Sequence, residues 1–142
     1  MVEDIRKAFD RWTAALAERD PEKIVACYHQ DAVLWGTFST KKRKGNTLIR
    51  EYFEQLVQRK KLRALCKNLD IRIYGDIAVN SGMYYFNFVD NNRDVMVPAR
   101  YTFVYQKTDG EWLIIEHHSS VLPPENVDLT PFIKLNKLEC QD

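Results

Sequence analysis

Four consecutive polar side chains, His117 to Ser120, follow an apolar run near the end of the sequence. They belong to the stretch "EWLIIEHHSSVLP", residues 111–123. An imidazole can exchange a proton near neutral pH, and a hydroxyl both donates and accepts hydrogen bonds. Neighbouring side chains of a strand point to opposite faces of a sheet, so His117 and His118 cannot serve one site as a pair. The sequence therefore predicts two separate polar features, one on each face.

The run before this strand, "ARYTFVYQK", is expected to pair with it as a hairpin through Thr-Asp-Gly. If Lys107 and Glu111 close a three-residue loop, every residue of one strand has a fixed partner on the other. One face is then predicted to hold the pairs Tyr105–Leu113, Phe103–Ile115, Tyr101–His117 and Ala99–Ser119. The other face is predicted to hold the pairs Gln106–Trp112, Val104–Ile114, Thr102–Glu116 and Arg100–His118.

The first of these faces is the candidate site. His117 can act there as a general acid or base, while Tyr101 or Tyr84 donates a hydrogen bond to a developing oxyanion. The same face could instead enclose a small organic ligand between aromatic walls. A histidine in an apolar layer is also commonly a hydrogen-bonded core residue, so this third interpretation stays open. The predicted ligand pocket comprises Trp35, Tyr84, Tyr101, Phe103, His117 and Ser119.

The second face is the candidate interface. Arg100, Glu116 and His118 are most simply explained as a satisfied ion-pair network. No predicted helix is left over to cover them, so we expect a second copy of the chain to do so, in a dimer or a larger ring. The predicted interface residues are Arg100, Trp112, Glu116 and His118.

The elements that position these faces begin with helices. Apolar residues recur at helical spacing over residues 2–19, and Asp20-Pro21 is a typical cap and first turn for a second helix that reaches Tyr28. Residues 32–39 have the composition of a strand, and Gly45-Asn46 is expected to start a third helix.

From about Leu62 the apolar period changes to two, and tight turns are expected at Gly75-Asp76, within "DNNRD" and at Thr-Asp-Gly. Three helices followed by a four-stranded antiparallel meander predict an α+β fold. Residues 1–122 are expected to form a single domain. Residues 123–142 look like a departing tail whose apolar residues could dock on the domain or on a partner: Phe132, Ile133, Leu135 and Leu138.

Composition excludes several classes of protein. A net charge of +1 provides no general attraction to nucleic acid or membrane, and the basic runs at 39–45 and 58–63 lack interleaved aromatic residues. The three cysteines, including Cys140, have no C-x-x-C spacing, which argues against a metal site or a disulfide framework. No signal peptide, membrane span or cofactor motif is recognisable, so we expect a cytoplasmic protein without a cofactor.

The order of the elements, "DP" before the second helix, "YF" in the third and above all residues 103–123, "FVYQKTDGEWLIIEHHSSVLP", is similar to the nuclear transport factor 2-like superfamily. Within it, the sequence resembles the association domain of calcium/calmodulin-dependent protein kinase II and SnoaL-like proteins. The resemblance covers roughly residues 2–123 and implies a bent, mainly antiparallel sheet that encloses a cone-shaped pocket with the helices. It also implies self-association through the opposite sheet face. The association domain lines its pocket with three arginines, and Tyr84, Phe103 and Ser119 stand at the matching positions here.

Two functions fit this sequence. The first is a homo-oligomeric module for assembly or small-molecule binding. The second, suggested by the SnoaL-like resemblance, is an isomerase, cyclase or lyase that uses His117 as acid or base. Enzymes of this fold typically place a carboxylate in the pocket, and the predicted pocket face of the final two strands has no Asp or Glu. The sequence therefore favours the module.

Overall fold

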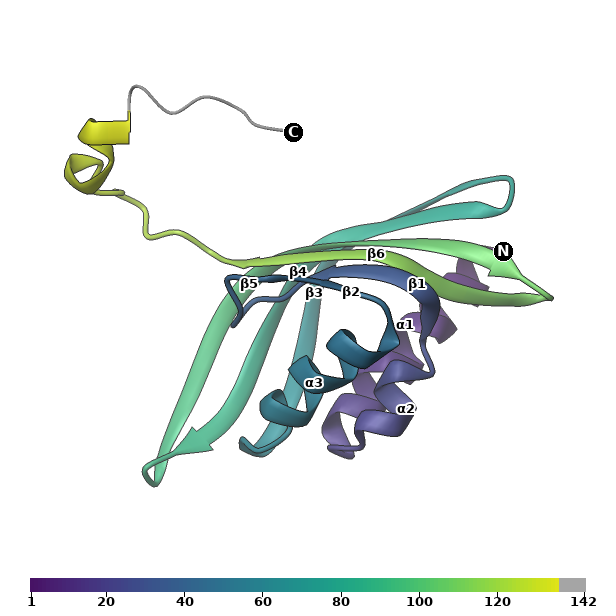
Figure 1. The fold of residues 1–142 in the computed structure, drawn as a ribbon, viewed down its shortest axis with the longest axis horizontal. Helices are drawn as coiled ribbons and strands as arrows, with labels where there is room; N and C mark the ends of the chain where they lie inside the picture. The colour runs from purple at the N-terminus through teal and green to yellow at the C-terminus, as the bar shows by residue number, and fades with distance from the viewer. Residues whose placement is uncertain (136–142) are drawn as a thin grey trace.

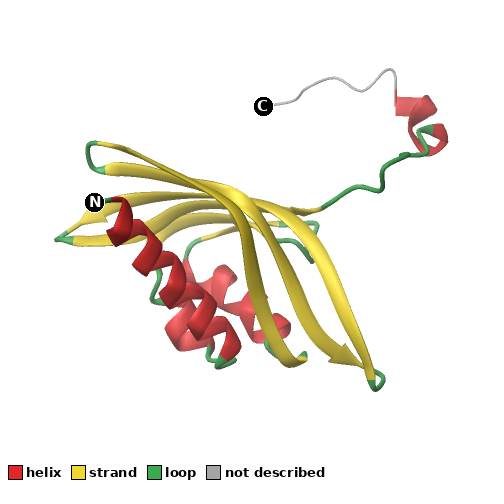
Figure 2. Cartoon of the chain, turned by 180° about the vertical axis from the view of Figure 1, so that it is seen from behind, coloured by secondary structure: helices red, strands yellow, loops and turns green. Residues whose placement is uncertain are grey.

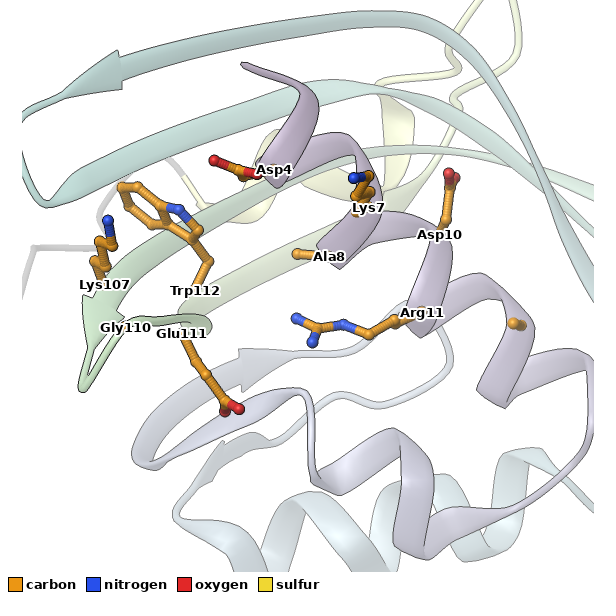
Figure 3. Close-up of a pocket in the computed structure, with 10 residues that line it drawn as sticks. Asp4, Lys7, Ala8, Asp10, Arg11, Lys107, Gly110, Glu111 and Trp112 are labelled. Carbon is orange, nitrogen blue, oxygen red and sulfur yellow. The ribbon is translucent and has the colours of Figure 1, made fainter. Parts of the chain in front are cut away.

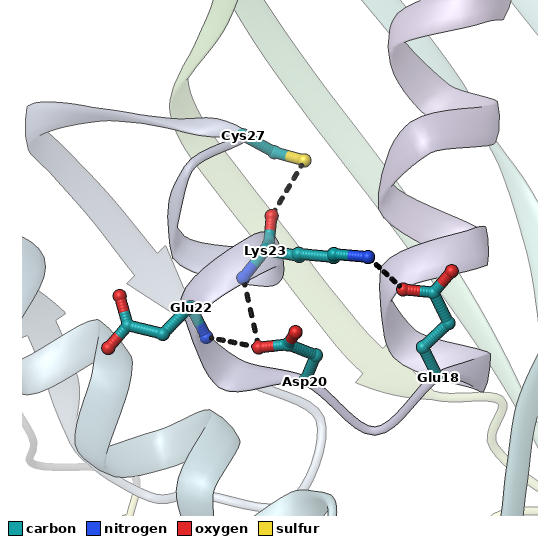
Figure 4. Close-up of polar contacts among 5 residues, drawn as sticks. All are labelled: Glu18, Asp20, Glu22, Lys23 and Cys27. Atoms are coloured by element: carbon teal, nitrogen blue, oxygen red, sulfur yellow. Dashed lines mark hydrogen bonds and ion pairs between the residues drawn. The ribbon is translucent and has the colours of Figure 1, made fainter.

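Three helices precede most of the sheet. The computed structural model describes residues 1–135, so Leu138 and Cys140 lie outside the described residues. The helices are α1, Val2–Ala17, α2, Pro21–Val25, and α3, Asn46–Leu56. The Asp20 carboxylate caps α2 by accepting the backbone N–H groups of Glu22 and Lys23 at 3.0 and 3.3 Å (Figure 4). The predicted apolar stripe of α1 is buried, as the exposures of Ile5, Phe9, Trp12 and Leu16 confirm.

The sheet has six strands in the order β2-β1-β6-β5-β4-β3 (Figure 1). Only the β1–β6 pair is parallel, so the sheet is mixed but mainly antiparallel and the predicted α+β class is confirmed. The predicted meander forms β3 to β6, with turns at the predicted places in the chain. The last loop, however, has two residues, Asp109 and Gly110, and not the predicted three, because Thr108 pairs with Glu111. The strand bounds are β1, Tyr28–Trp35, β2, Lys42–Lys44, β3, Lys60–Tyr74, β4, Ile77–Asp90, β5, Arg93–Thr108, and β6, Glu111–Val121.

The first two strands differ from the prediction. Tyr28 was expected in the second helix, but α2 ends at Val25 and Tyr28 begins β1, which stops at Trp35. The basic run at 39–45, where no strand was predicted, contains the short strand β2. Arg43 on β2 is buried and pairs with Glu51 of α3 at 3.0 Å. β2 forms by pairing with β1, and the ion pair connects its central residue to α3.

All three helices lie on the concave side of the sheet, which arches over them (Figures 1 and 2). Alternate strand residues on that side pack with the helices, and the opposite, convex side is not covered by any described helix. We call this uncovered side the outer face. The largest fully buried side chains are mostly aromatic: Trp12, Tyr84, Tyr105, Phe9, Phe53, Phe86 and Phe103.

The chain leaves the sheet after β6 and ends its described part in a short 3-10 helix, Thr130–Leu135 (Figure 1). Phe132 and Ile133 expose 54% and 68% of their surface, so these two side chains are not docked on the domain. Within the described residues, no helix is both long enough and apolar enough to cross a membrane.

Candidate functional site

A β-bulge decides which residues of β6 face the helices. Tyr105 pairs with Ile114 and Val104 pairs with Glu116, so Ile115 is an extra residue without a partner on β5. Beyond the bulge Phe103 lies opposite His117, and Tyr101 lies opposite Ser119. The predicted register, which put Tyr101 opposite His117, was therefore wrong by two residues. The bulge accounts for one of them, and the two-residue loop between Thr108 and Glu111 accounts for the other.

The bulge also changes the neighbours of His117 along its own strand. The prediction put Leu113 and Ile115 on the inner face, but Trp112 and Ile114 occupy it, with exposures of 8% and 0%. Strict alternation fails because the extra residue reverses the phase of the strand. Trp112 is consequently on the side of the helices, away from the predicted interface.

His117 is 2% exposed and has a protein partner on each ring nitrogen. The Tyr28 hydroxyl lies 2.7 Å from Nδ1, and the Tyr84 hydroxyl lies 3.1 Å from Nε2. Trp12 donates its indole N–H to the Tyr28 oxygen at 3.1 Å. The imidazole also stacks on Phe103, with ring centroids 3.9 Å apart. Protein groups therefore satisfy the hydrogen bonding of His117 without a ligand.

These contacts indicate which nitrogen of His117 holds the proton. The Tyr28 oxygen accepts from Trp12, so we assign its own proton to Nδ1 of His117. Nε2 then holds the imidazole proton and donates it to Tyr84. The Tyr84 proton is left for the Ser119 or Thr37 hydroxyl, which are hydrogen-bonded to each other. The hydroxyl protons of Tyr28 and Tyr84 then both have acceptors.

Burial keeps this cluster neutral. Desolvation lowers the pKa of His117 to about 3, with a smaller effect from His118. Desolvation also raises the pKa of both Tyr28 and Tyr84. A histidine with so low a pKa has little tendency to accept a proton near neutral pH.

Tyr101 has a different partner from the one predicted. It shares the inner face with Tyr84, and the two rings stack with centroids 4.7 Å apart. Its hydroxyl, however, donates to the Asn80 side-chain oxygen at 3.1 Å. The structure therefore brings Tyr84, Phe103, His117 and Ser119 together as predicted, and turns the Tyr101 hydroxyl away from the imidazole. Trp12, Tyr28 and Thr37 are members of the cluster that the sequence did not indicate.

One end of the cluster leads to a group of aromatic rings around Arg59. Phe38 lies edge-on to Phe86 at 5.4 Å, and Phe86 in turn lies 4.6 Å from Tyr84. The Phe38 backbone N–H donates to the Tyr52 hydroxyl at 3.2 Å. We call Phe38, Phe86, Phe88 and Arg59 the aromatic mouth of the interior.

Gly36 allows Tyr52 its position beside this mouth. A Cβ atom at Gly36 would lie 2.4 Å from the Tyr52 ring, closer than real contacts allow. Because glycine has no side chain, the loop after β1 can approach α3 at this point.

The outer face holds the other predicted polar feature. Trp35 was expected in the pocket but belongs here, because it pairs with His118 across β1 and β6 and is 41% exposed. Arg100 lies opposite Ser120, not opposite His118 as predicted. None of the ion pairs in the described part of the chain joins Arg100 to Glu116. The predicted intramolecular network is thus absent there, although the same side chains line one open depression: Arg100, Thr102, Glu116, His118 and Ser120.

Two adjoining depressions lie beside α1. The first, between α1 and the β5–β6 hairpin, is lined in part by Trp112, a residue of the predicted interface (Figure 3). In the first, the Lys107 ammonium lies 5.9 Å from the centre of the Trp112 ring. The second reaches Cys27, whose thiol donates weakly to the Lys23 carbonyl at 3.5 Å (Figure 4). Burial raises the pKa of this thiol to about 11, so it is not an activated nucleophile. Among the described residues no three His, Cys, Asp or Glu side chains are grouped so that they could hold a metal ion.

The model of the calcium/calmodulin-dependent protein kinase II association domain family matches residues 2–123. The chain belongs to this family. A solved structure from Xanthomonas campestris, provisionally described as such an association domain, is 41% identical, with a TM-score of 0.80 and coverage of 86% of this chain and 87% of the other. The chain is therefore similar to a described association domain in both sequence and fold.

Solved structures of lower sequence identity share this fold and are described as nuclear transport factor 2-like. A superfamily protein of Salmonella enterica serovar Typhimurium is 18% identical, with a TM-score of 0.79 and coverage of 89% and 94% of the two chains. A protein of Streptomyces avermitilis, provisionally described as a dehydratase, is 13% identical, with a TM-score of 0.77 and coverage of 85% and 95%. A comparison with curated proteins found no significant match.

Proposed function

We propose that this chain is a homo-oligomeric association module that binds a second copy of itself through the outer face of its sheet. The observation that supports this most directly is the one-sided arrangement of the helices. A central sheet is ordinarily covered on both faces when both present apolar side chains. Here the concave face is covered, and the outer face exposes the Trp35 ring beside His118, with ring centroids 6.1 Å apart.

The chemistry of the outer face also fits self-association. A symmetric dimer buries the same patch from each copy, so a patch must complement itself. Arg100, Glu116 and His118 provide both signs of charge and lack ion-pair partners within the described chain. Each can therefore meet an opposite charge on the second copy. The family to which the chain belongs is named for association, and this supports the same proposal.

Replacing Trp35 by glutamate tests the association surface. A tryptophan at the centre of an interface commonly contributes at least about 2 kcal/mol, so Trp35→Glu is expected to weaken the dimer at least about thirtyfold. Light scattering at micromolar concentration measures this directly. Leu48→Glu is the matched control, because Leu48 is 40% exposed, almost as much as Trp35, but lies on α3 at the other side of the sheet. A wild-type monomer, or equal effects of both changes, would reject the proposal.

The second part of the proposal is that the interior binds a small organic ligand. The His117 end is satisfied by Tyr28 and Tyr84, so the ligand site lies further out, between the Thr37–Ser119 hydroxyl pair and the aromatic mouth. Ser119 is only 5% exposed, whereas Thr37 is partly buried, so Thr37 is the more accessible of the two hydroxyls to a polar group of a ligand.

The alternative function, an isomerase, cyclase or lyase, has less support. Some proteins of the same fold have names that suggest chemistry, such as the Streptomyces dehydratase. In this chain, however, the low pKa of His117 makes it a weak base, and tyrosine hydroxyls already occupy both of its ring nitrogens. We therefore favour binding over catalysis.

A further inference from the structure

The chain after β6 exposes apolar side chains in an ordered turn. We call residues 122–135 the C-terminal arm. The Phe132 backbone N–H donates to the Leu129 carbonyl at 2.9 Å, within the turn that forms the 3-10 helix. Leu129, Phe132 and Ile133 have the spacing i, i+3 and i+4, so they share one side of this turn. Leu129 exposes 66% of its surface, as much as Ile133, so the apolar side of the arm is uncovered.

Two prolines direct the arm away from its own domain. Leu122 continues the pairing of β6 with β5 by donating its backbone N–H to the Pro98 carbonyl at 2.9 Å. Pro123 and Pro124 have no N–H to donate, and a residue before a proline disfavours the helical backbone, so the chain continues in an extended form. The 3-10 helix lies clear of the strands and of the three α-helices (Figures 1 and 2). Its own domain therefore offers no surface that covers the apolar side of the arm.

The outer face has an apolar patch near the point where the arm begins. Leu65, Tyr85 and Pro98 are register partners across β3, β4 and β5, so their side chains form one row, and Met83 and Met96 lie in the neighbouring rows. They lie on the outer face, since the alternate residues of β4 are buried on the inner side. We call these five residues the outer patch. Leu65 and Met96 expose 51% and 64% of their surface, and exposed apolar patches commonly mark interaction sites.

Cations border the outer patch. Lys67 and Arg100 lie in the row on one side of Tyr85, and Arg63 lies in the row on the other side. None of the ion pairs in the described part of the chain includes these three residues. The depression that contains Arg63 is lined by one acidic residue, Asp94, so positive charge is in excess around the patch.

The arm has the complementary charge. Between residues 122 and 133 its two charged side chains, Glu125 and Asp128, are both acidic. The Asp128 carboxylate accepts the Thr130 backbone N–H at 3.0 Å, and hydrogen bonds from Thr130 lower the pKa of this carboxyl, so it is ionised at neutral pH. An apolar turn preceded by acidic residues complements an apolar row bordered by cations.

We propose that the C-terminal arm of one copy packs its apolar side on the outer patch of a second copy, and that the two copies exchange arms reciprocally. This inference rests on the self-association part of the proposed function. The arm begins beside Pro98, at the border of the face that is proposed to meet the second copy, so it can continue onto the sheet of that copy. Reciprocal exchange also fits two-fold symmetry, in which each contact occurs twice.

Aspartate substitutions on the two sides of the contact test the exchange. Phe132→Asp and Leu65→Asp should each weaken the dimer of the full chain about ten- to a hundredfold, because each variant homodimer loses both reciprocal contacts. Leu48→Asp should leave the dimer constant unchanged, since Leu48 is exposed on α3 and away from the outer face. Analytical ultracentrifugation over a dilution series measures these constants. Met96→Asp is the second patch variant if Leu65→Asp does not fold.

Mixing the two variants shows whether the contact joins different copies. In a mixed dimer of Phe132→Asp with Leu65→Asp, both changes fall on one of the two contacts and the other contact is intact. We therefore expect the mixed dimer, after the statistical factor for mixing, to be about three- to tenfold tighter than either variant homodimer. An arm that packs on its own copy predicts no such recovery.

The outcomes separate this inference from self-association itself. A dimer constant that Phe132→Asp does not change, or a mixture no tighter than the two variant homodimers, would overturn the arm exchange and leave the outer-face dimer in place. A wild-type chain that is monomeric at micromolar concentration would reject both the arm exchange and the outer-face dimer.

Discussion

Acidification from about pH 7 to about pH 4 is expected to reduce the free energy of unfolding by about 3 kcal/mol through His117 alone. The folded protein holds this histidine neutral, with a pKa of about 3, whereas the unfolded chain has a pKa near its ordinary value of 6.5. The unfolded state therefore binds a proton first as the pH falls. The stability from His117 is fully present above about pH 6.5 and is lost progressively between that value and about pH 3.

The range between about pH 7 and pH 5 gives the clearest measurement, because most carboxylates stay ionised there and His117 still accounts for about 2 kcal/mol. Urea unfolding at several pH values measures the loss. His117→Gln is the matched variant, since an amide can bond to Tyr28 and Tyr84 but does not titrate. At about pH 7 the His117→Gln variant should have a lower free energy of unfolding than the wild type. Between about pH 7 and pH 5 that free energy should fall less in the variant than in the wild type. Parallel curves for both proteins would show that His117 is not buried in its neutral form.

Replacing Trp12 by alanine is expected to reduce the free energy of unfolding by about 3–5 kcal/mol, the range typical of a large buried aromatic residue. Trp12 is 0% exposed and packs against Tyr84 and Phe103, with ring centroids 5.8 and 5.2 Å away. The change would also remove the indole N–H that Tyr28 accepts. Denaturant unfolding monitored by circular dichroism measures the effect.

Trp35→Ala is the matched control for Trp12→Ala. It removes the same side chain from the outer face, where Trp35 is 41% exposed, so the cost to the folding of one chain should be below about 1 kcal/mol. The two tryptophan variants should be compared at a protein concentration where the chain is monomeric. Similar losses for the two tryptophans would contradict the assignment of the two faces.

Local patterns predicted most of the fold. The stripe from Ile5 to Leu16, the Asp20-Pro21 cap and the turn residues at Gly75 and Gly110 each act within a few positions of the chain. α1, the start of α2 and these turns therefore lie where they were expected. The start of β1 was missed because Tyr28 has the spacing of an α2 core residue. Its membership of a strand depends on pairing with β6, which is distant in sequence.

The candidate site was harder to predict, because it depends on one extra residue. Ile115 is an ordinary strand residue, and nothing in its neighbours indicates a bulge. The two-residue loop puts Ile114 opposite Tyr105 and Trp112 on the inner face, and the inserted residue then returns His117 to that face, opposite Phe103. Arg59 was also missed, since it lies in a basic run that is typical of a solvated surface. Only the fold brings Phe38 and Phe88 to its guanidinium from separate parts of the chain.

The parallel pairing of β1 with β6 also affects the order in which the chain can fold. The hydrogen bond between Tyr28 and His117 joins residues 89 positions apart. During synthesis, the first three helices are therefore complete long before the strand that contains His117 exists. Contacts this distant in sequence close slowly, and a chain that lacks its last strand exposes apolar surface. We expect the aromatic interior to assemble in one late step, after synthesis has passed residue 117, so that nascent chains shorter than this stay sensitive to protease.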